Sequence, residues 1–100
     1  MALIKSCLTT GAAPTTDSFS GTTASAMSTN ATATITYTAP SGKIILGIDS
    51  LSVIGSNSSG KEQVAVKSAV NNGSSIEFTC VNYYQVTSQT ATVSCNILLQ

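Results

Sequence analysis

Residues 31–38 read Ala-Thr-Ala-Thr-Ile-Thr-Tyr-Thr, and this stretch decides the fold class. Threonine occupies every second position and the positions between are small or apolar, so an extended chain has one apolar and one hydroxylated side. A period of two is typical of an antiparallel strand that is buried on one face. The stretch therefore predicts a β-strand whose threonines face water.

The chain beyond this strand predicts a turn and then a longer strand. Pro40 and Gly42 lie in the sequence Ala-Pro-Ser-Gly, where Pro fixes φ and Gly permits a positive φ, as a turn requires. Residues 43–54 are apolar on both faces at first and alternate only later. This pattern favours a central strand that is covered on both faces, with a bend near Gly47 or Asp49.

A hairpin and a final strand follow. Residues 55–60 contain only Gly, Ser and Asn and predict a loop, and valines at mostly two-residue spacing favour a strand over 64–70. Asn71-Asn72-Gly73 predicts a tight hairpin in which both central residues adopt positive φ. The last two strands are predicted to run through Ile76, Phe78 and Cys80 and through Ala91, Val93, Cys95, Ile97 and Leu99.

A short alternating strand over residues 2–8 brings the number of predicted strands to six, with no helix. Short strands separated by turn signals predict an all-β fold, a single antiparallel β-sandwich or jelly-roll-like domain with an extended N-terminal arm. The sandwich is expected over residues 30–100. Residues 1–29 are expected to form the N-terminal strand and the Ser/Thr-rich arm.

The arm has few side chains with which to order itself. Residues 9–30 are almost wholly small or hydroxylated, and Phe19 and Met27 are the only large apolar side chains among them. The segment is therefore expected to be held by its own sheet or by a neighbouring subunit. In the second case Phe19 and Met27 are the expected contacts to the partner.

Charge is nearly absent from the chain. Charged residues make up 8% of the sequence against roughly 25% in ordinary domains, the formal net charge is zero, and Arg and His are missing. Without His no side chain has an unperturbed pKa near neutrality, and four scattered Lys cannot neutralise a row of phosphates. Neither an enzyme, nor a cofactor site, nor nucleic-acid binding is therefore expected. A neutral surface rich in Ser and Thr lacks the repulsion that keeps monomers apart, which favours a homo-oligomer.

The expected compartment of the protein bears on the state of its cysteines. No apolar run is long enough to span a membrane, and the first residues lack the hydrophobic stretch of a secretory signal. Cys7, Cys80 and Cys95 are then expected to be free thiols, because disulfides are rare inside cells. With no His, three Cys leave a zinc site incomplete, so no metal is expected.

Two residue patterns resemble catalytic sites, but the residues around them do not fit those activities. Gly55, Gly60 and Lys61 have the spacing of a phosphate-binding loop, but Glu62 stands where Ser or Thr would bind magnesium, and no helix follows. Glu62 and Glu77 lie on neighbouring predicted strands, yet the aromatic platforms that a glycosidase needs are scarce. A hairpin loop and solvated edge charges account for these residues.

Tyr83-Tyr84, in the loop before the final strand, is the best candidate for contact with another molecule. Tyrosine combines a wide apolar face with a polar tip, which suits a recognition surface. The alternative is that the pair merely caps the end of the sandwich.

Three stretches resemble small β-sandwich modules of tailed-bacteriophage virions. They are Ile-Thr-Tyr-Thr-Ala-Pro-Ser-Gly-Lys-Ile-Ile-Leu-Gly-Ile over 35–48, the Asn-Gly hairpin with Ser-Ile-Glu-Phe-Thr-Cys over 75–80, and Thr-Ala-Thr-Val-Ser-Cys-Asn-Ile-Leu-Leu over 90–99. Such modules occur in head decoration proteins, head fibres and the ends of tail fibres.

The resemblance implies a non-enzymatic structural protein that is made in the host cytoplasm and resides in the virion. As a capsid-decoration or fibre-type subunit, it would assemble with itself and with other virion proteins through its N-terminal arm. The alternative is a small carbohydrate- or receptor-binding module that uses Tyr83 and Tyr84, with a host-surface glycan as partner.

Overall fold

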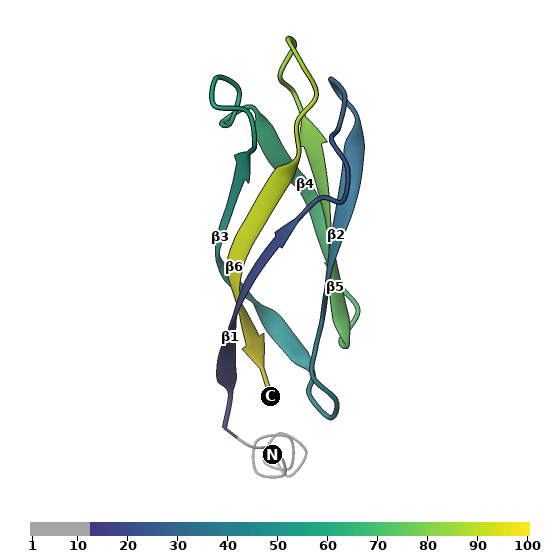
Figure 1. Cartoon of the computed structure of the whole chain (residues 1–100). Coiled ribbons are helices and arrows are strands. Elements are labelled where there is room, and N and C mark those ends of the chain that lie inside the picture. The colour runs from purple at the N-terminus through teal and green to yellow at the C-terminus, as the bar shows by residue number, and fades with distance from the viewer. Residues whose placement is uncertain (1–12) are drawn as a thin grey trace.

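The computed structural model describes residues 13–100, which form two three-stranded antiparallel sheets packed face to face (Figure 1). The strands are β1 (Thr15–Thr22), β2 (Thr32–Thr38), β3 (Ile45–Gly55), β4 (Val64–Asn71), β5 (Ser75–Asn82) and β6 (Ala91–Leu99). One sheet has the order β1-β6-β3 and the other β2-β5-β4. The predicted antiparallel β-sandwich is therefore confirmed. No helix in residues 13–100 is long and apolar enough to cross a membrane.

β5 and β6 are the central strands of their sheets. Along β6 every second side chain is buried in the core, and the side chains between are half-buried because strands flank β6 on both sides. The side chains of β5 and β6 that were predicted to face the core are buried, so this prediction is confirmed. The outward position of the β2 threonines is confirmed as well. The buried core consists of Met27, Ile35, Tyr37, Ile45, Val64, Ile76, Phe78, Cys80, Ala91, Val93, Cys95, Ile97 and Leu99.

β1 brings part of the expected arm into the sandwich. It pairs with β6 along its whole length, from Thr15 opposite Leu99 to Thr22 opposite Thr92. Of the two ways in which this segment was expected to be held, its own sheet is the one found for β1. The reason is that β6 has a second edge whose backbone groups need partners, and β1 supplies them without needing many apolar side chains. The strand predicted over 2–8 lies outside the described residues.

Two aromatic rings hold β1 against the opposite sheet. Phe19 of β1 lies edge-to-face with Tyr37 at 5.3 Å between ring centroids and stacks on Phe78 at 5.9 Å. The Tyr37 hydroxyl donates a hydrogen bond to Asp17 Oδ2 at 2.7 Å. Burial, together with the hydrogen bond to Asp17 and its negative charge, raises the pKa of Tyr37 to about 12. The phenol therefore keeps its proton, and with it this bond between the sheets, at neutral pH.

The strand predicted over 43–54 lies at an edge, so the expectation of a central strand is wrong. β3 pairs within its sheet with β6 alone. Its register shifts between Ile45 and Gly47 and again between Asp49 and Ser52, which confirms the predicted bend. Each bulge adds residues that leave the pleat. The bulges change which face of the strand successive side chains occupy. The apolar residues on both faces of this segment therefore do not indicate that β3 is covered on both faces.

The predicted Asn-Gly hairpin is confirmed between β4 and β5, with one correction. Gly73 has a φ of 98°, but Asn72 does not have the expected positive φ. The Asn72 side chain instead accepts the Ser75 backbone N–H through Oδ1 at 2.9 Å, as Asn does in many turns. The Ile45 N–H donates to the Gly73 carbonyl at 2.8 Å, which ties the start of β3 to this turn.

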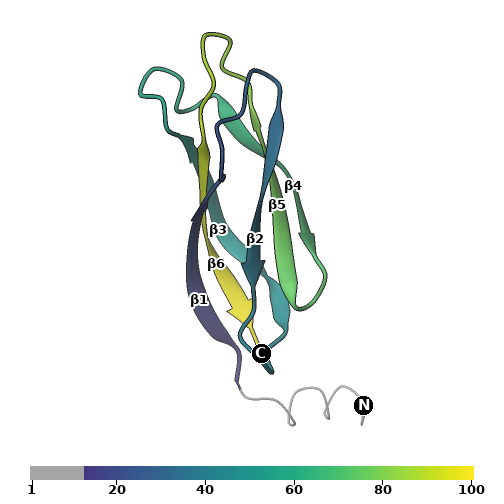
Figure 2. The ribbon, with the colours of Figure 1, turned by 45° about the vertical axis from the view of Figure 1, so that its right-hand side comes forward.

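The sandwich is elongated, with principal extents of 57 × 23 × 18 Å. Because Thr15 lies opposite Leu99, the described chain begins beside its own C-terminus. Three loops lie at the other end of the sandwich, as Figure 2 shows. The molecule therefore has one end that carries the C-terminus and the start of β1, and one end made of loops.

Candidate recognition site at the loop tip

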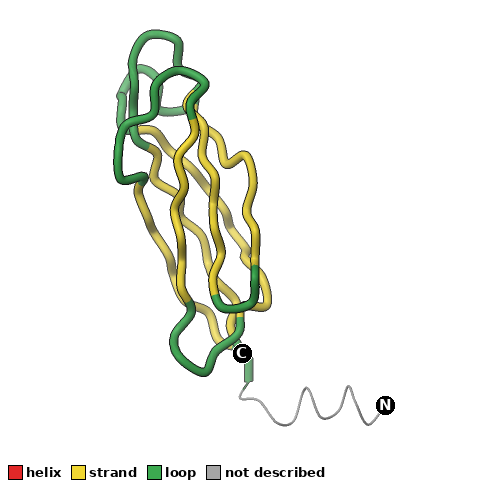
Figure 3. Tube along the Cα trace, turned by 90° about the vertical axis from the view of Figure 1, so that its right-hand side faces the viewer, coloured by secondary structure: helices red, strands yellow, loops and turns green. Residues whose placement is uncertain are grey.

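The loops between β1 and β2, between β3 and β4, and between β5 and β6 gather at the end of the sandwich away from the C-terminus (Figure 3). We call residues 23–31, 56–63 and 83–90 the loop tip. Loops at one end of a rigid sandwich are the usual place for recognition residues. The loop tip is therefore the first candidate site.

Asn82, at the end of β5, is a fully buried amide that holds two of these loops. Its Nδ2 donates to the carbonyl of Met27 at 2.8 Å and to that of Thr87 at 3.2 Å. Its Oδ1 accepts the Tyr84 N–H at 2.9 Å and the Gln89 Nε2 at 3.0 Å. Both donors and both acceptor lone pairs of the amide are used, so its burial stabilises one loop arrangement.

Gln89 connects the third loop to this network. Its buried Nε2 also donates to the Gly60 carbonyl at 2.7 Å, and its Oε1 accepts the Asn57 N–H at 3.0 Å. Its backbone pairs with that of Met27 in an isolated bridge. Within residues 13–100 no buried side-chain nitrogen or oxygen lacks a partner. Asn82 and Gln89 thus fix all three loops relative to one another.

Tyr83 and Tyr84 do not form a shared platform, because they take different positions. The Tyr84 ring lies over Gly60, where it fills the space that any Cβ would need. The Tyr84 carbonyl accepts the Thr29 hydroxyl at 2.7 Å, which anchors it further. Tyr83 leaves 49% of its surface exposed. Tyr84 therefore caps the sandwich end, and Tyr83 is the tyrosine that is free to contact another molecule.

The surface of the loop tip is almost uncharged. Val86, in the same loop as Tyr83, is 76% exposed. Lys61 and Glu62 are the only charged residues in the three loops, and both are exposed. The remaining exposed groups are mainly hydroxyls and amides. Such a surface suits a neutral ligand that offers hydrogen bonds and a face for an aromatic ring.

Phe19 and Met27, the other two predicted contact residues, pack against the protein's own core. Met27 is buried in the core beneath the loop tip, and Phe19 is half-buried against Tyr37 and Phe78. Both side chains anchor their segment, as the sequence suggested, but the anchorage is intramolecular. Met27 is therefore not available to a partner.

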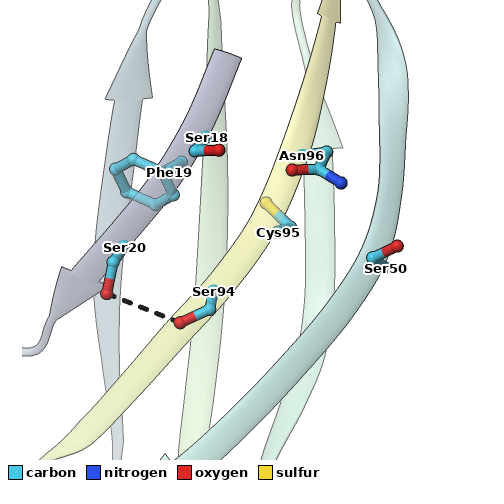
Figure 4. A pocket seen from close by; sticks show the side chains of 7 residues that line it. All are labelled: Ser18, Phe19, Ser20, Ser50, Ser94, Cys95 and Asn96. Carbon is cyan, nitrogen blue, oxygen red and sulfur yellow. Dashed lines mark hydrogen bonds between the residues drawn. The ribbon is translucent and has the colours of Figure 1, made fainter. Parts of the chain in front are cut away.

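A hollow of about 300 Å³ lies on the sheet formed by β1, β6 and β3 (Figure 4). Ser20 and Ser94 meet across it with their hydroxyls 3.4 Å apart. Among residues 13–100 no carboxylate or other general base lines it, so none of them supplies its hydroxyls with the partner that activates a serine nucleophile. The lining residues are Ser18, Phe19, Ser20, Ser50, Ser94, Cys95 and Asn96.

The two described cysteines are buried free thiols, as predicted, and Cys7 lies outside the described residues. Burial raises the pKa of Cys80 and of Cys95, which keeps both thiols protonated and unreactive. In residues 13–100 no three His, Cys, Asp or Glu side chains lie close enough to hold a metal ion. Lys61, Glu62, Lys67 and Glu77 are exposed, as expected of solvated charges.

Comparison of the chain with protein-family models, with curated proteins and with solved structures gives no match. Its function is therefore inferred from its own residues.

Sequence inspection missed Asn82 and Gln89, the residues that organise the loop tip. A signal was present, because each continues the inward phase of a central strand. Asn82 follows Ile76, Phe78 and Cys80 at two-residue spacing, and Gln89 precedes Ala91 in the same way. A polar side chain at a core-facing position needs a hydrogen-bond partner. Such a residue in the sequence therefore indicates a buried hydrogen-bond network.

Proposed function

We propose that this chain is a non-enzymatic structural subunit of a bacteriophage virion, of the capsid-decoration or fibre type. It attaches through the end that carries the N-terminal arm and presents the loop tip at the opposite end. The observation that carries this proposal is the elongated sandwich, with the start of β1 beside the C-terminus at one end and an ordered loop cluster at the other. That arrangement holds a surface away from a point of attachment.

The near absence of charge supports an assembled state. A neutral, hydroxyl-rich surface packs against a neighbour without leaving unpaired ions in the contact. The same neutrality gives free monomers little electrostatic repulsion. The sequence resemblance to phage sandwich modules is what supports a bacteriophage virion as the particle.

Removal of residues 2–12 tests attachment through the arm. These residues precede β1, so the shortened chain retains all six strands of the described residues. We expect the full chain to form oligomers larger than a dimer and the shortened chain to lose these larger species, with unchanged circular dichroism and thermal midpoint. Sedimentation velocity measures the oligomers that each of the two chains forms.

The choice of end point for this deletion matters. A deletion of residues 1–28 also removes β1, leaves an edge of β6 without partners and takes away Phe19. It therefore measures folding and not assembly. Undiminished oligomers after removal of residues 2–12 would contradict attachment through the arm, and a full chain that stays monomeric at every concentration would contradict the structural role.

A second candidate function, recognition of a neutral host-surface glycan by the loop tip, is favoured by the exposed Tyr83 ring among hydroxyls and amides. We expect Tyr83→Ala to weaken glycan binding at least about tenfold, as loss of a central aromatic contact does. Val70→Ala is the matched control, because Val70 is also exposed but lies on β4. A glycan array followed by calorimetry gives the readout, and equal binding by both variants would rule out this site.

A further inference from the structure

Exposed apolar side chains of the described chain are concentrated on β3. Seven large hydrophobic side chains are exposed, and four of them lie on β3 or directly before it. Each of these four exposes between 43% and 55% of its surface. We call them the β3 strip: Ile44, Leu46, Leu51 and Ile54.

The β3 strip lies on an edge that no strand of the described chain covers. β3 has β6 as its only partner in the sheet, and its 11 residues make it the longest strand. Proteins ordinarily protect such edges with charge, most often Lys. β4, an edge strand of the other sheet, has Lys67. β3 carries a single charge, Asp49, whose carboxylate accepts a hydrogen bond from Ser50.

We propose that the β3 strip is a self-association surface that binds the β3 strip of a second copy of this chain around a local two-fold axis. Leu46 and Ile54 lie four positions on either side of Ser50. An axis at Ser50 that relates two antiparallel copies of β3 therefore places Leu46 of each copy opposite Ile54 of the other. A surface that is complementary to itself in this way is what a two-fold contact requires.

Charge also favours a second copy as the occupant. Between Ile44 and Gly60 the chain has no charged residue other than Asp49. A strongly charged partner would find no counter-charge there, whereas an identical neutral strip meets little opposition. The two Asp49 carboxylates lie near the axis, and their repulsion limits the affinity of the pair.

The contact is made by side chains more than by backbone. Two bulges interrupt the even spacing of backbone donors and acceptors along the outer side of β3. Bulges of this kind oppose open-ended sheet extension. The predicted product is therefore a closed dimer of unattached chains, in which the two loop tips point in opposite directions, and not a filament of stacked edges.

The first experiment is a symmetric cross-link in the full chain. Ser50→Cys places a thiol at the proposed axis, so mild oxidation should give a covalent dimer. Ser68→Cys, at an exposed position of β4, is the matched control, and the wild-type chain gives the background from its own thiols. A Ser50→Cys chain that is cross-linked no faster than this control overturns the proposal.

The second experiment measures affinity by sedimentation across a range of concentrations. We expect Leu46→Ser with Ile54→Ser to weaken dimerisation at least about tenfold. Val86→Ser, which changes an even more exposed apolar side chain at the loop tip, should leave it unchanged. Asp49→Asn should tighten the dimer about twofold to threefold by removing the repulsion.

Each result decides the matter. Dimerisation that resists the double substitution, or that weakens with Asp49→Asn, overturns the proposed axis. Loss of the dimer on removal of residues 2–12 shows that the dimer contact depends on the arm, which overturns self-association through β3 but leaves attachment through the arm standing.

Discussion

Phe78→Ala is expected to lower the free energy of unfolding by about 3 to 5 kcal/mol, the cost of a large cavity at the centre of a core. Phe78 is fully buried, lies on central strand β5 and stacks on Phe19 of β1. The substitution therefore removes the contact through which the middle of one sheet meets the edge of the other. Urea unfolding followed by circular dichroism gives the difference.

Thr79→Ala is the matched control for this prediction. Thr79 is the next residue of β5 and lies on the outer face, so its truncation opens no cavity in the core. We expect it to change stability by about 0.5 kcal/mol or less. A Phe78→Ala loss no larger than that of the control would show that the two sheets do not share the described core.

Asn82→Ala is expected to cost about 3 kcal/mol, although it removes only a small polar side chain. The substitution leaves the carbonyl of Met27, the N–H of Tyr84 and the Nε2 of Gln89 without the partner that they have now. Each buried polar group that loses its partner costs about 1 to 3 kcal/mol, partly recovered where water enters. Denaturant unfolding measures the loss, and hydrogen exchange should show faster opening of the loop tip.

Gln85→Ala is the control for the loop tip, because Gln85 lies in the same loop but is exposed. A double-mutant cycle of Asn82→Ala and Gln89→Ala adds a sharper test. Because the two amides are bonded at 3.0 Å, the second substitution should cost less in the presence of the first. Strictly additive losses, or an Asn82→Ala chain as stable as Gln85→Ala, would contradict a network that fixes the loops.

The sandwich could be predicted because most strands of this chain have an unbroken period of two. In β2 and β6 that alternation alone assigns which side chains face the core. The period of two gives a wrong assignment where the backbone departs from regular strand geometry. In β3 the bulges shift the phase, so that apolar residues on both faces suggested a covered strand where an edge exists.

β1 shows a different limit of sequence inspection. The segment Thr-Thr-Asp-Ser-Phe-Ser-Gly-Thr has little apolar surface, and so it was expected to be an arm. Its stability comes from the unpaired edge of β6, a feature of the assembled sheet that no local pattern carries. The loop tip is similar, because the partners of Asn82 and Gln89 are backbone groups of distant loops.

We propose that this protein builds an assembly through one end and presents the loop tip at the other. Electron cryo-microscopy of the assembly that the full chain forms tests this claim most directly. We expect the amino-terminal ends of neighbouring subunits to meet in the shared contact, with Tyr83 and Val86 facing outward. An assembly whose subunits meet through their loop tips, with the amino-terminal ends facing outward, would contradict it.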